Sequence, residues 1–584
     1  MKRHVASLLA QALAAMREAG ELPADIELPQ VQVERARDRA HGDYAANTAM
    51  VLAKPAGQKP RELAEAMRAR LPASEAIAGV EVAGPGFLNF TLAAAARHEA
   101  VRAALREGPA FGRGDAGAGH RVHIEYVSAN PTGPLHVGHG RGAAFGDALA
   151  SLLETAGYDV HREYYVNDAG RQVDILAVSL WLRYLQAAGV AVPFPEKGYR
   201  GDYIVTHARE LLDADGHAYV HGADTVTAGL PAEEADPEAY LDALAARARA
   251  LLGEAAYRRV LDFALGAILG DIREELAAFG IGFDRYFSER ELADSGRIEA
   301  AVQRLTEAGY TYEAEGALWF RAAELGDDKD RVLRRDNGLT TYFAADVAYH
   351  LEKLERGFHT LVNVWGADHH GYVPRVKAAL QALGVDAERL DVRLVQFAVL
   401  YRGGEKLPMS TRAGEFVTLR ELRDEVGKDA ARFFYVMRRS EQHMDFDLDL
   451  AKSESADNPV YYCQYAHARI CSVFRQLAER GLACRDAPEE AALARLDTEH
   501  EAVLLDLIGR YPEVIEAAAV SREPHQVAQY LRELAGAFHT YYNAVPFIID
   551  DQPLRDARLT LVRATQQVLA NGLALLGVDA PQSM

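Results

Sequence analysis

The chain has 584 residues, of which 49% are hydrophobic and 26% charged, with a formal net charge of −21. This composition predicts a soluble globular protein of several domains, and it excludes disorder as the main state. The acidic balance argues against a general nucleic-acid coat, although selected basic patches could still meet an RNA.

The composition also predicts where the protein works. Its apolar stretches are far shorter than the ~20 residues of a membrane-spanning helix, so we expect no membrane association. The first residues are amphipathic and not a secretory leader. The three cysteines (Cys463, Cys471 and Cys484) contain no CxxC pair and fit a reducing compartment. We therefore expect a cytoplasmic protein with no dedicated metal site.

Residues 1–110 are predicted to form a small α+β domain. An amphipathic N-terminal helix precedes short extended pieces around 26–33, and further helices are expected at about 44–52 and 60–71. The segment 80–90 has the pattern of two strands around a Gly-Pro-Gly turn.

A glycine-rich segment at 111–120 is interpreted as a linker. It contains the dinucleotide-binding pattern GxGxxG, at Gly112, Gly114 and Gly117. That pattern has meaning only between a strand and a helix. Here it precedes the strand expected at 121–127, so we do not assign it to a nucleotide.

Strands and helices alternate through the middle of the chain, which predicts a Rossmann-like α/β domain at 121–452 with a parallel sheet. A charged, helical insertion is expected at about 180–330. Beyond 453 apolar residues recur at helical spacing, which predicts an all-α domain at 453–584. The strands expected in the middle domain lie at 121–127, 159–166, 360–365 and 392–401, and its helices at 138–155 and 174–187.

The most informative stretch, 125–142, follows the first of these strands. It combines prolines and glycines with His136 and His139, three residues apart where a helix begins. A helix N-terminus attracts anions, and Gly138 would let a ligand approach the backbone closely, so a polyphosphate fits this geometry. The alternatives are histidines that cap or pack at a strand–helix junction, or a metal-binding pair.

A second polar, glycine-rich loop at 401–414 also follows an expected strand. Its cationic and hydroxyl side chains could neutralise phosphates in a mobile flap. By itself it could equally be a surface connection. The side chains in question are Lys406, Ser410, Thr411 and Arg412.

Together the two loops resemble the HIGH and KMSKS signatures of class I aminoacyl-tRNA synthetases. Further stretches resemble the bacterial arginyl-tRNA synthetases, and the resemblance covers essentially the whole chain. They lie at 128–139, 166–172, 365–372, 409–412 and 457–469.

The resemblance implies a two-step reaction. Arginine attacks the α-phosphate of ATP, giving arginyl-adenylate and pyrophosphate, and the arginyl group then passes to the terminal 2′-hydroxyl of arginine tRNA. Both steps need alignment and charge stabilisation more than a protein nucleophile. Magnesium is expected with the polyphosphate. The residues implied for ATP are His136, Gly138, His139, Gly366, Asp368, His369, Met409 and Ser410.

The second loop departs from the KMSKS pattern. Aligned on Met409, its two lysine positions hold Pro408 and Thr411. The catalytic cation that joins His136 and His139 is therefore Lys406 or Arg412. We favour Lys406, although Arg412 has the better bidentate geometry for phosphate.

The same resemblance implies an arginine site. Tyr342 and Asp346 are four residues apart on one helical face and match the family's guanidinium pocket. Asp346 could otherwise be a solvated or helix-capping carboxylate. The residues implied for the rest of the amino acid are Glu125, Ser128, Asn130 and His136. Such carboxylates would reject the neutral citrulline and only partly satisfy lysine.

Asp368, His369 and His370 could be read as metal ligands. Adjacent histidines in a strand point to opposite faces, so at most one of the two could join Asp368. We do not favour a metal there.

For the tRNA, the N-terminal domain resembles one that contacts the tRNA elbow. Arg35, Arg37 and Arg39 could meet phosphates or simply form a solvated strand face. In the C-terminal domain Tyr461 and Tyr465 could stack on anticodon bases, although most such tyrosines belong to a core.

The favoured hypothesis is therefore an arginine–tRNA ligase that works as a monomer. Members of this family typically need tRNA for adenylate formation. The rivals are another ligase of the HIGH-bearing superfamily, which would activate a different substrate, and a non-catalytic RNA-binding paralogue.

Overall fold

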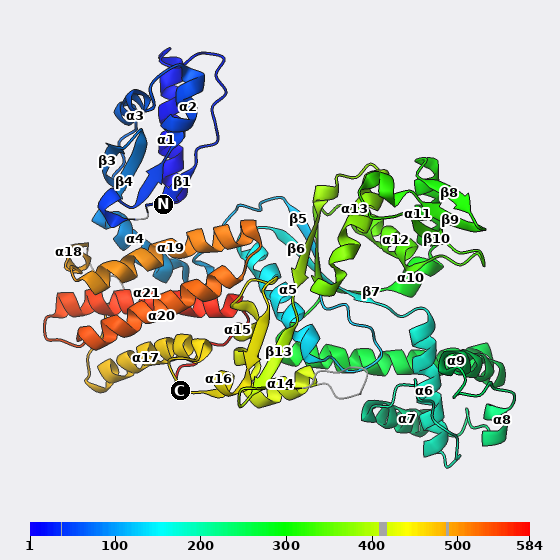
Figure 1. Cartoon of the computed structure of the whole chain (residues 1–584). Coiled ribbons are helices and arrows are strands. Elements are labelled where there is room, and N and C mark those ends of the chain that lie inside the picture. The colour runs from blue at the N-terminus through cyan, green and yellow to red at the C-terminus, as the bar shows by residue number, and fades with distance from the viewer. Residues whose placement is uncertain (37, 408–416, 486–489) are drawn as a thin grey trace.

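The computed structural model describes residues 1–36, 38–407, 417–485 and 490–584, without the side chain of Arg39. A small N-terminal unit, a parallel sheet with insertions and a helical bundle follow one another along the chain (Figure 1). The predicted fold class is confirmed, because the central sheet is parallel and the described residues after Asp447 form only helices and their connections. Among the described residues no helix is long and apolar enough to cross a membrane.

The N-terminal unit packs three helices on a four-stranded antiparallel sheet of order β1-β2-β4-β3. The two strands expected around the Gly-Pro-Gly turn are β3 and β4. The elements are α1 (Lys2–Glu18), β1 (Val33–Arg35), η1 (Arg39–His41), β2 (Tyr44–Ala46), α2 (Thr48–Ala56), α3 (Pro60–Ala69), β3 (Ile77–Ala83), β4 (Phe87–Leu92), α4 (Ala94–Glu107) and η2 (Gly108–Ala110).

The prediction of a helix at 44–52 was wrong about where the helix begins. Residues Tyr44–Ala46 form strand β2, and helix α2 begins only at Thr48. Tyr44 and Ala46 alternate inward, where they pair with Phe90 and Leu88 of β4 and are buried. Burial of this two-residue alternation against the sheet outweighs the local helical tendency.

The central sheet has five parallel strands in the order β12-β11-β5-β6-β7. Strands β5 and β11 are neighbours, and Glu125 pairs with Asn363. The loops that leave their carboxyl ends therefore meet at one edge, where open α/β sheets bind ligands. The strands and their helices are β5 (Arg121–Glu125), α5 (Val137–Thr155), β6 (Asp159–Val166), α6 (Arg171–Ala187), β7 (Arg285–Ser288), α12 (Tyr342–Glu355), β11 (Thr360–Gly366), η4 (Ala367–Tyr372), α13 (Val373–Ala382), η5 (Ala387–Arg389) and β12 (Leu390–Val395).

The single strand expected at 392–401 was also wrong. The chain leaves the parallel sheet after Val395, and β13 (Ala398–Arg402) joins a second sheet of order β14-β13-β15. At the break Arg141, buried in α5, donates to the carbonyls of Gln396 (2.8 Å) and Gln442 (2.7 Å). The remaining elements of this region are β14 (Glu405–Lys406), α14 (Leu419–Val426), α15 (Lys428–Val436), β15 (Met444–Asp447) and α16 (Leu448–Lys452).

Two insertions extend from the sheet on the side away from the bundle (Figure 1). One is helical and packs on α6. The other carries a three-stranded antiparallel sheet of order β10-β9-β8. Their elements are α7 (Asp202–Asp215), α8 (Ala223–Thr227), α9 (Pro237–Ala278), α10 (Glu289–Asp294), α11 (Arg297–Glu307), β8 (Thr311–Ala314), β9 (Ala317–Phe320), η3 (Ala322–Leu325) and β10 (Arg331–Arg334).

The C-terminal bundle is built from long amphipathic helices, and α4 packs against α19 and α21. The glycine-rich segment between α4 and β5 folds over the end of α5. There Gly114 N–H donates to Thr155 O and Gly117 N–H to Ala156 O. No helix begins in it, which agrees with its interpretation as a linker. The bundle helices are α17 (Pro459–Glu479), α18 (Glu490–Leu493), α19 (Glu499–Ser521), α20 (His525–Ala544) and α21 (Gln552–Leu575).

Candidate active site

The two histidines of the first signature begin helix α5. His136 is the N-cap, and its Nδ1 accepts the Gly138 N–H at 3.1 Å, while His139 Nδ1 accepts the His136 N–H at 3.3 Å. Their rings stack with centroids 3.8 Å apart. Burial lowers the pKa of both, that of His139 to about 3. His139 is therefore neutral near pH 7, with its proton on Nε2, and can donate a hydrogen bond to a phosphate oxygen.

The segment that follows the second signature lies against the first. Val137 N–H donates to Val417 O at 3.1 Å, Leu419 N–H donates to Leu135 O at 2.9 Å, and His136 and Thr418 form an antiparallel bridge. The two signatures are more than 250 residues apart in the chain. The fold thus joins the exit of the second loop to the start of α5.

A glycine from each of two strand-end loops faces the ring of Phe397. A Cβ atom on Gly138 would lie 2.8 Å from the His136 ring and 3.4 Å from Phe397. One on Gly366, at the end of β11, would lie 3.3 Å from Phe397 and would collide with Asp368. Phe397 is 44% exposed although it is a large apolar residue. These three residues form an open apolar surface that a flat ring could cover.

The chain leaves β5 at Glu125 through strained backbone. Val127 and Ser128 have φ of 69° and 40°, which non-glycine residues rarely adopt. This turn brings Ser128 Oγ to 3.0 Å from Glu125 Oε1, and the same hydroxyl accepts the Tyr165 N–H at 3.1 Å. Strain of this kind persists at functional sites because the surroundings hold it in place.

A cluster of carboxylates lies past the ends of β5, β6 and β7. Burial raises the pKa of Asp346 on α12 to about 6, a hydrogen bond from the Tyr372 hydroxyl opposes the rise, and Glu125 adds to it. Burial also raises the pKa of Glu289 to about 7, with Asp346 and Asp168 contributing like charge. Glu289 is only 7% exposed, and its Oε2 has no hydrogen-bond partner among the described residues. This cluster can accept a cationic group.

The other residues predicted for the amino acid line the same edge. Tyr342 begins α12, is 56% exposed, and its hydroxyl lies against Gly170 at the start of α6. Asn130 donates to Gln172 Oε1 at 3.0 Å and accepts from Asn167 Nδ2 at 3.2 Å. The fold therefore brings Glu125, Ser128, Asn130, Tyr342 and Asp346 to one edge of the sheet.

The segment after β11 corrects one expectation. Asp368, His369 and His370 lie in the 3₁₀ helix η4 and not in a strand, because the strand ends at Gly366. All three are exposed. His369 Nε2 lies 3.7 Å from Asp368 Oδ2. Within the described ranges no three His, Cys, Asp or Glu side chains are arranged to hold a metal ion.

The second signature can be described only in part. Lys406 lies exposed at the end of β14, where Tyr401 is its partner on β13. Met409, Ser410 and Arg412 lie outside the described residues, as do Pro408 and Thr411. The choice between Lys406 and Arg412 as the phosphate-binding cation stays a prediction.

Of the predicted elbow-binding arginines, only the side chain of Arg35 is described. Its guanidinium is half-buried and bonds to two carboxylates of α19, Asp506 at 2.6 Å and Glu513 at 2.9 Å. A phosphate would have to replace one of them. Arg37 and the side chain of Arg39 lie outside the described residues.

The predicted anticodon-binding tyrosines form a ladder on α17. Tyr461 and Tyr465 stack with centroids 5.7 Å apart, and Tyr465 stacks in turn on His539 of α20. The Arg469 guanidinium lies 4.5 Å from the Tyr465 ring centroid. Both tyrosines are half-buried, so the ladder leaves ring surface open to a base.

Sequence reasoning missed three residues of this edge. Lys353 shares a helical face with Asp346 and His350, at spacings of seven and three residues, and that pattern was a usable signal. Glu289 directly follows a parallel strand, β7, which was not predicted. Phe397 was read as part of a strand, and nothing in the sequence set it apart.

An α/β sheet that carries HIGH-type histidines and a helical anticodon-type bundle defines a class I aminoacyl-tRNA synthetase, and comparisons with known proteins agree. Residues 3–92 match the arginyl-tRNA synthetase N-terminal domain. Residues 101–193 and 276–460 match the catalytic domain of class I tRNA synthetases (R), and residues 463–584 match the DALR anticodon binding domain.

Relatives resemble the chain over its full length. The arginine–tRNA ligase of Halorhodospira halophila is 84% identical and that of Thioalkalivibrio sulfidiphilus 59%, each over all of both chains. The Thermus thermophilus arginyl-tRNA synthetase structure is 26% identical and covers all of both chains with a TM-score of 0.75.

The chain belongs to the arginyl-tRNA synthetase family. Members of this family are ligases that join arginine to its tRNA with ATP, so arginine, ATP and arginine tRNA are its substrates. The arginine–tRNA ligase predicted from the sequence is confirmed, and both rivals are wrong.

Proposed function

We propose that the carboxylate cluster binds the guanidinium of arginine. Asp346 lies close enough to Glu289 to raise its pKa, and the Glu289 Oε2, which has no partner among the described residues, is the observation that carries the assignment. A guanidinium offers five donors in a planar fork, which two carboxylates can satisfy. Its positive charge would also lower both raised pKa values and hold the carboxylates ionised. Tyr342, at the exposed start of α12, would cover the arginine.

The opposite end of arginine would lie on the strained turn after β5. Glu125 would accept the α-ammonium group, with Ser128 and Asn130 beside it. His136 would lie between this end and the phosphates, so that the arginine carboxylate faces the α-phosphate of ATP. Alignment of these two groups, and not a protein nucleophile, would then account for the first step.

ATP would lie over the start of α5. The adenine would cover Gly138, Gly366 and Phe397, and Asp368 with His369 would lie toward the ribose. His139 would donate to a phosphate oxygen in front of the helix N-terminus. Met409, Ser410 and one cation, Lys406 or Arg412, would close over the polyphosphate. Magnesium would be bound by the phosphate oxygens of ATP, because no described cluster of side chains is arranged to hold it.

The two terminal domains would bind the tRNA. The N-terminal unit, residues 1–110, would meet the elbow, with Arg37 and Arg39 toward the phosphates and Arg35 holding the unit against α19. The helical bundle, residues 453–584, would stack anticodon bases on Tyr461 and Tyr465. The catalytic domain, 121–452 with its insertion at about 180–330, would lie between them. We also propose a cytoplasmic monomer: Cys463, Cys471 and Cys484 are not joined by disulfides, which suits a reducing compartment.

Arginine-dependent ATP–pyrophosphate exchange tests the arginine site. The assay is run with and without arginine tRNA, and with lysine and citrulline in place of arginine. We expect exchange with arginine alone, and only when tRNA is present. Asp346→Asn and Glu289→Gln should each raise KM for arginine by about 100-fold, as expected for an unpaired buried charge. Glu355→Gln, at the far end of the same helix, is the control. Unchanged KM for arginine in both pocket variants would overturn the assignment.

A further inference from the structure

Lys353 is a fully buried lysine directly behind the proposed arginine site. Its Nζ lies 2.6 Å from Glu125 Oε2 and 3.1 Å from Asn363 Oδ1, and its side chain is 0% exposed. The ammonium also lies 4.1 Å from the centroid of the Tyr349 ring. A lysine is almost never buried unless it is paired, so this ammonium and the Glu125 carboxylate depend on each other.

The same lysine begins a hydrogen-bond chain toward the other end of the site. Asn363 Nδ2 donates to His350 Nε2 at 2.8 Å, and His350 Nδ1 donates to the backbone carbonyl of Asp346 at 2.7 Å. Burial lowers the pKa of His350 to about 3, so the ring is neutral and can accept on one nitrogen while it donates on the other. The chain runs from Glu125 on β5 through β11 to Asp346 on α12.

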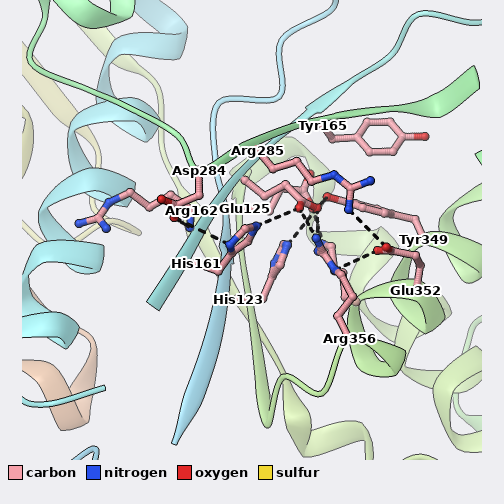
Figure 2. Close-up of polar contacts among 12 residues, drawn as sticks. His123, Glu125, His161, Arg162, Tyr165, Asp284, Arg285, Tyr349, Glu352 and Arg356 are labelled. Carbon is pink, nitrogen blue, oxygen red and sulfur yellow. Dashed lines mark hydrogen bonds and ion pairs between the residues drawn. The ribbon is translucent and has the colours of Figure 1, made fainter. Parts of the chain in front are cut away.

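A second set of charges surrounds this chain and is already paired. Arg356 and the Tyr349 hydroxyl both bond to the buried Glu163, at 2.7 Å each. His123 Nε2 lies 3.0 Å from Oε1 of the same carboxylate. Figure 2 shows His123, Tyr349 and Arg356 converging from the strand and from α12. Because these groups satisfy Glu163, Lys353 is the cation that neutralises Glu125.

We propose that Lys353 is a positioning residue for arginine activation, which pairs with the Glu125 carboxylate and holds it at a set separation from Asp346. It would do so without touching the substrate. The carboxylate for the α-ammonium group and the carboxylate for the guanidinium would then lie one arginine length apart before the substrate arrives. This inference rests on the proposed assignment of Glu125 and Asp346 to arginine.

The charge environment predicts what removal of the ammonium does. Glu125 and Asp346 repel each other, and Lys353 offsets that repulsion at Asp346. The other charged groups facing them are Glu163 and His123 on the sheet, Arg356 on α12, Arg375 on α13 and Glu289 on α10. Without Lys353 the pKa of Asp346, already raised by burial, would rise further, and arginine binding would weaken as pH falls.

Lys353→Met keeps an unbranched side chain, one atom shorter than lysine, and removes its charge. In exchange assays with an arginine tRNA transcript, we expect about a 10-fold or larger rise in KM for arginine, while KM for ATP changes less than about twofold. The rise should grow as pH falls from about 8 to about 6.5. Lys377→Met, which removes a half-exposed partner of Glu388, is the control and should change neither constant. A folded Lys353→Met protein with an unchanged KM for arginine would overturn the proposal.

The variant Glu125→Gln tests the role of Lys353 separately from the assignment of Glu125 to arginine. If Glu125→Gln leaves KM for arginine unchanged, the assignment of Glu125 fails and the role of Lys353 fails with it. If Glu125→Gln raises KM and Lys353→Met does not, only the role of Lys353 is overturned.

The double variant Lys353→Met/Glu125→Gln buries no unpaired charge, so it remains testable if Lys353→Met alone does not fold. Because Lys353 acts through Glu125, the KM of the double variant for arginine should lie within about twofold of the KM of Glu125→Gln alone. Fully additive effects would contradict the proposal.

Discussion

Arg432 of α15 and Asp147 of α5 form a buried ion pair, with Arg432 Nη2 at 2.5 Å from Asp147 Oδ2. The same guanidinium donates to Leu576 O at 2.9 Å, past the end of α21, and to Phe279 O at 3.0 Å, past the end of α9. One side chain thus ties the C-terminal bundle and the insertion to the helix that begins with the signature histidines.

Loss of this tie should destabilise the protein. Arg432→Met leaves the Asp147 carboxylate buried without its cation, and it leaves the carbonyls of Leu576 and Phe279 without their donor. We therefore expect a loss of about 3–5 kcal/mol in the free energy of unfolding. Urea denaturation followed by circular dichroism measures it. Arg106→Met, on the exposed end of α4, is the control. Arg432→Met/Asp147→Leu should recover part of the loss, and a double variant no more stable than the single one would contradict the pairing.

Two glycines of helix α5 should respond differently to the same substitution. Gly138→Ala places a methyl group 2.8 Å from the His136 ring, on the face proposed for adenosine. We expect pyrophosphate exchange to fall about 10-fold or more, chiefly through KM for ATP. Gly142→Ala meets no atom within 4 Å and should keep full activity. It should even gain up to about 1 kcal/mol in stability from helix propensity. Equal losses in both variants would point to the helix and not to the ligand face.

Arginine binding should weaken in acid. Asp346 has a pKa of about 6 and Glu289 of about 7, both raised by burial, so each gains a proton as pH falls through its pKa and loses its charge for the guanidinium. KM for arginine should therefore rise as pH falls from about 8 to about 6, while KM for ATP stays flatter. Exchange kinetics across this range measure both constants. In Asp346→Asn the slope should be smaller, and an unaltered slope would assign the titration to other groups.

Arg35 should act on tRNA through its carboxylate partners. Arg35→Ala removes the ion pairs of the N-terminal unit with Asp506 and Glu513, so KM for tRNA should rise several-fold, while KM for arginine measured at saturating tRNA stays constant. Glu513→Gln should act in the same direction, because it weakens the same tie. Aminoacylation at varied tRNA concentration measures the effect. Tighter tRNA binding in Glu513→Gln would instead mean that Arg35 contacts phosphate directly.

Local sequence patterns determined much of this protein. A strand, a glycine-rich turn and a helix could be predicted at 121–155, because apolar runs and glycines influence the backbone of only a few neighbouring residues. The two signatures lay within such segments, which is why the family could be inferred from them. One error fell at 44–52, where packing against β4 overrode the local pattern. The other fell at 392–401, where the chain leaves the parallel sheet and the Gln396 carbonyl accepts a hydrogen bond from buried Arg141.

Only the tertiary structure decided which charges meet. Lys353 and Glu125 are 228 residues apart in the chain, yet their charged atoms form a buried pair 2.6 Å apart. Asp346 raises the pKa of Glu289 because β7 ends at the same edge of the sheet at which α12 begins. Burial and pairing set the protonation and position of a carboxylate, and both depend on segments that no local pattern relates. The sequence by itself therefore determined the fold class and the signatures, while the chemistry of the arginine pocket was decided by packing.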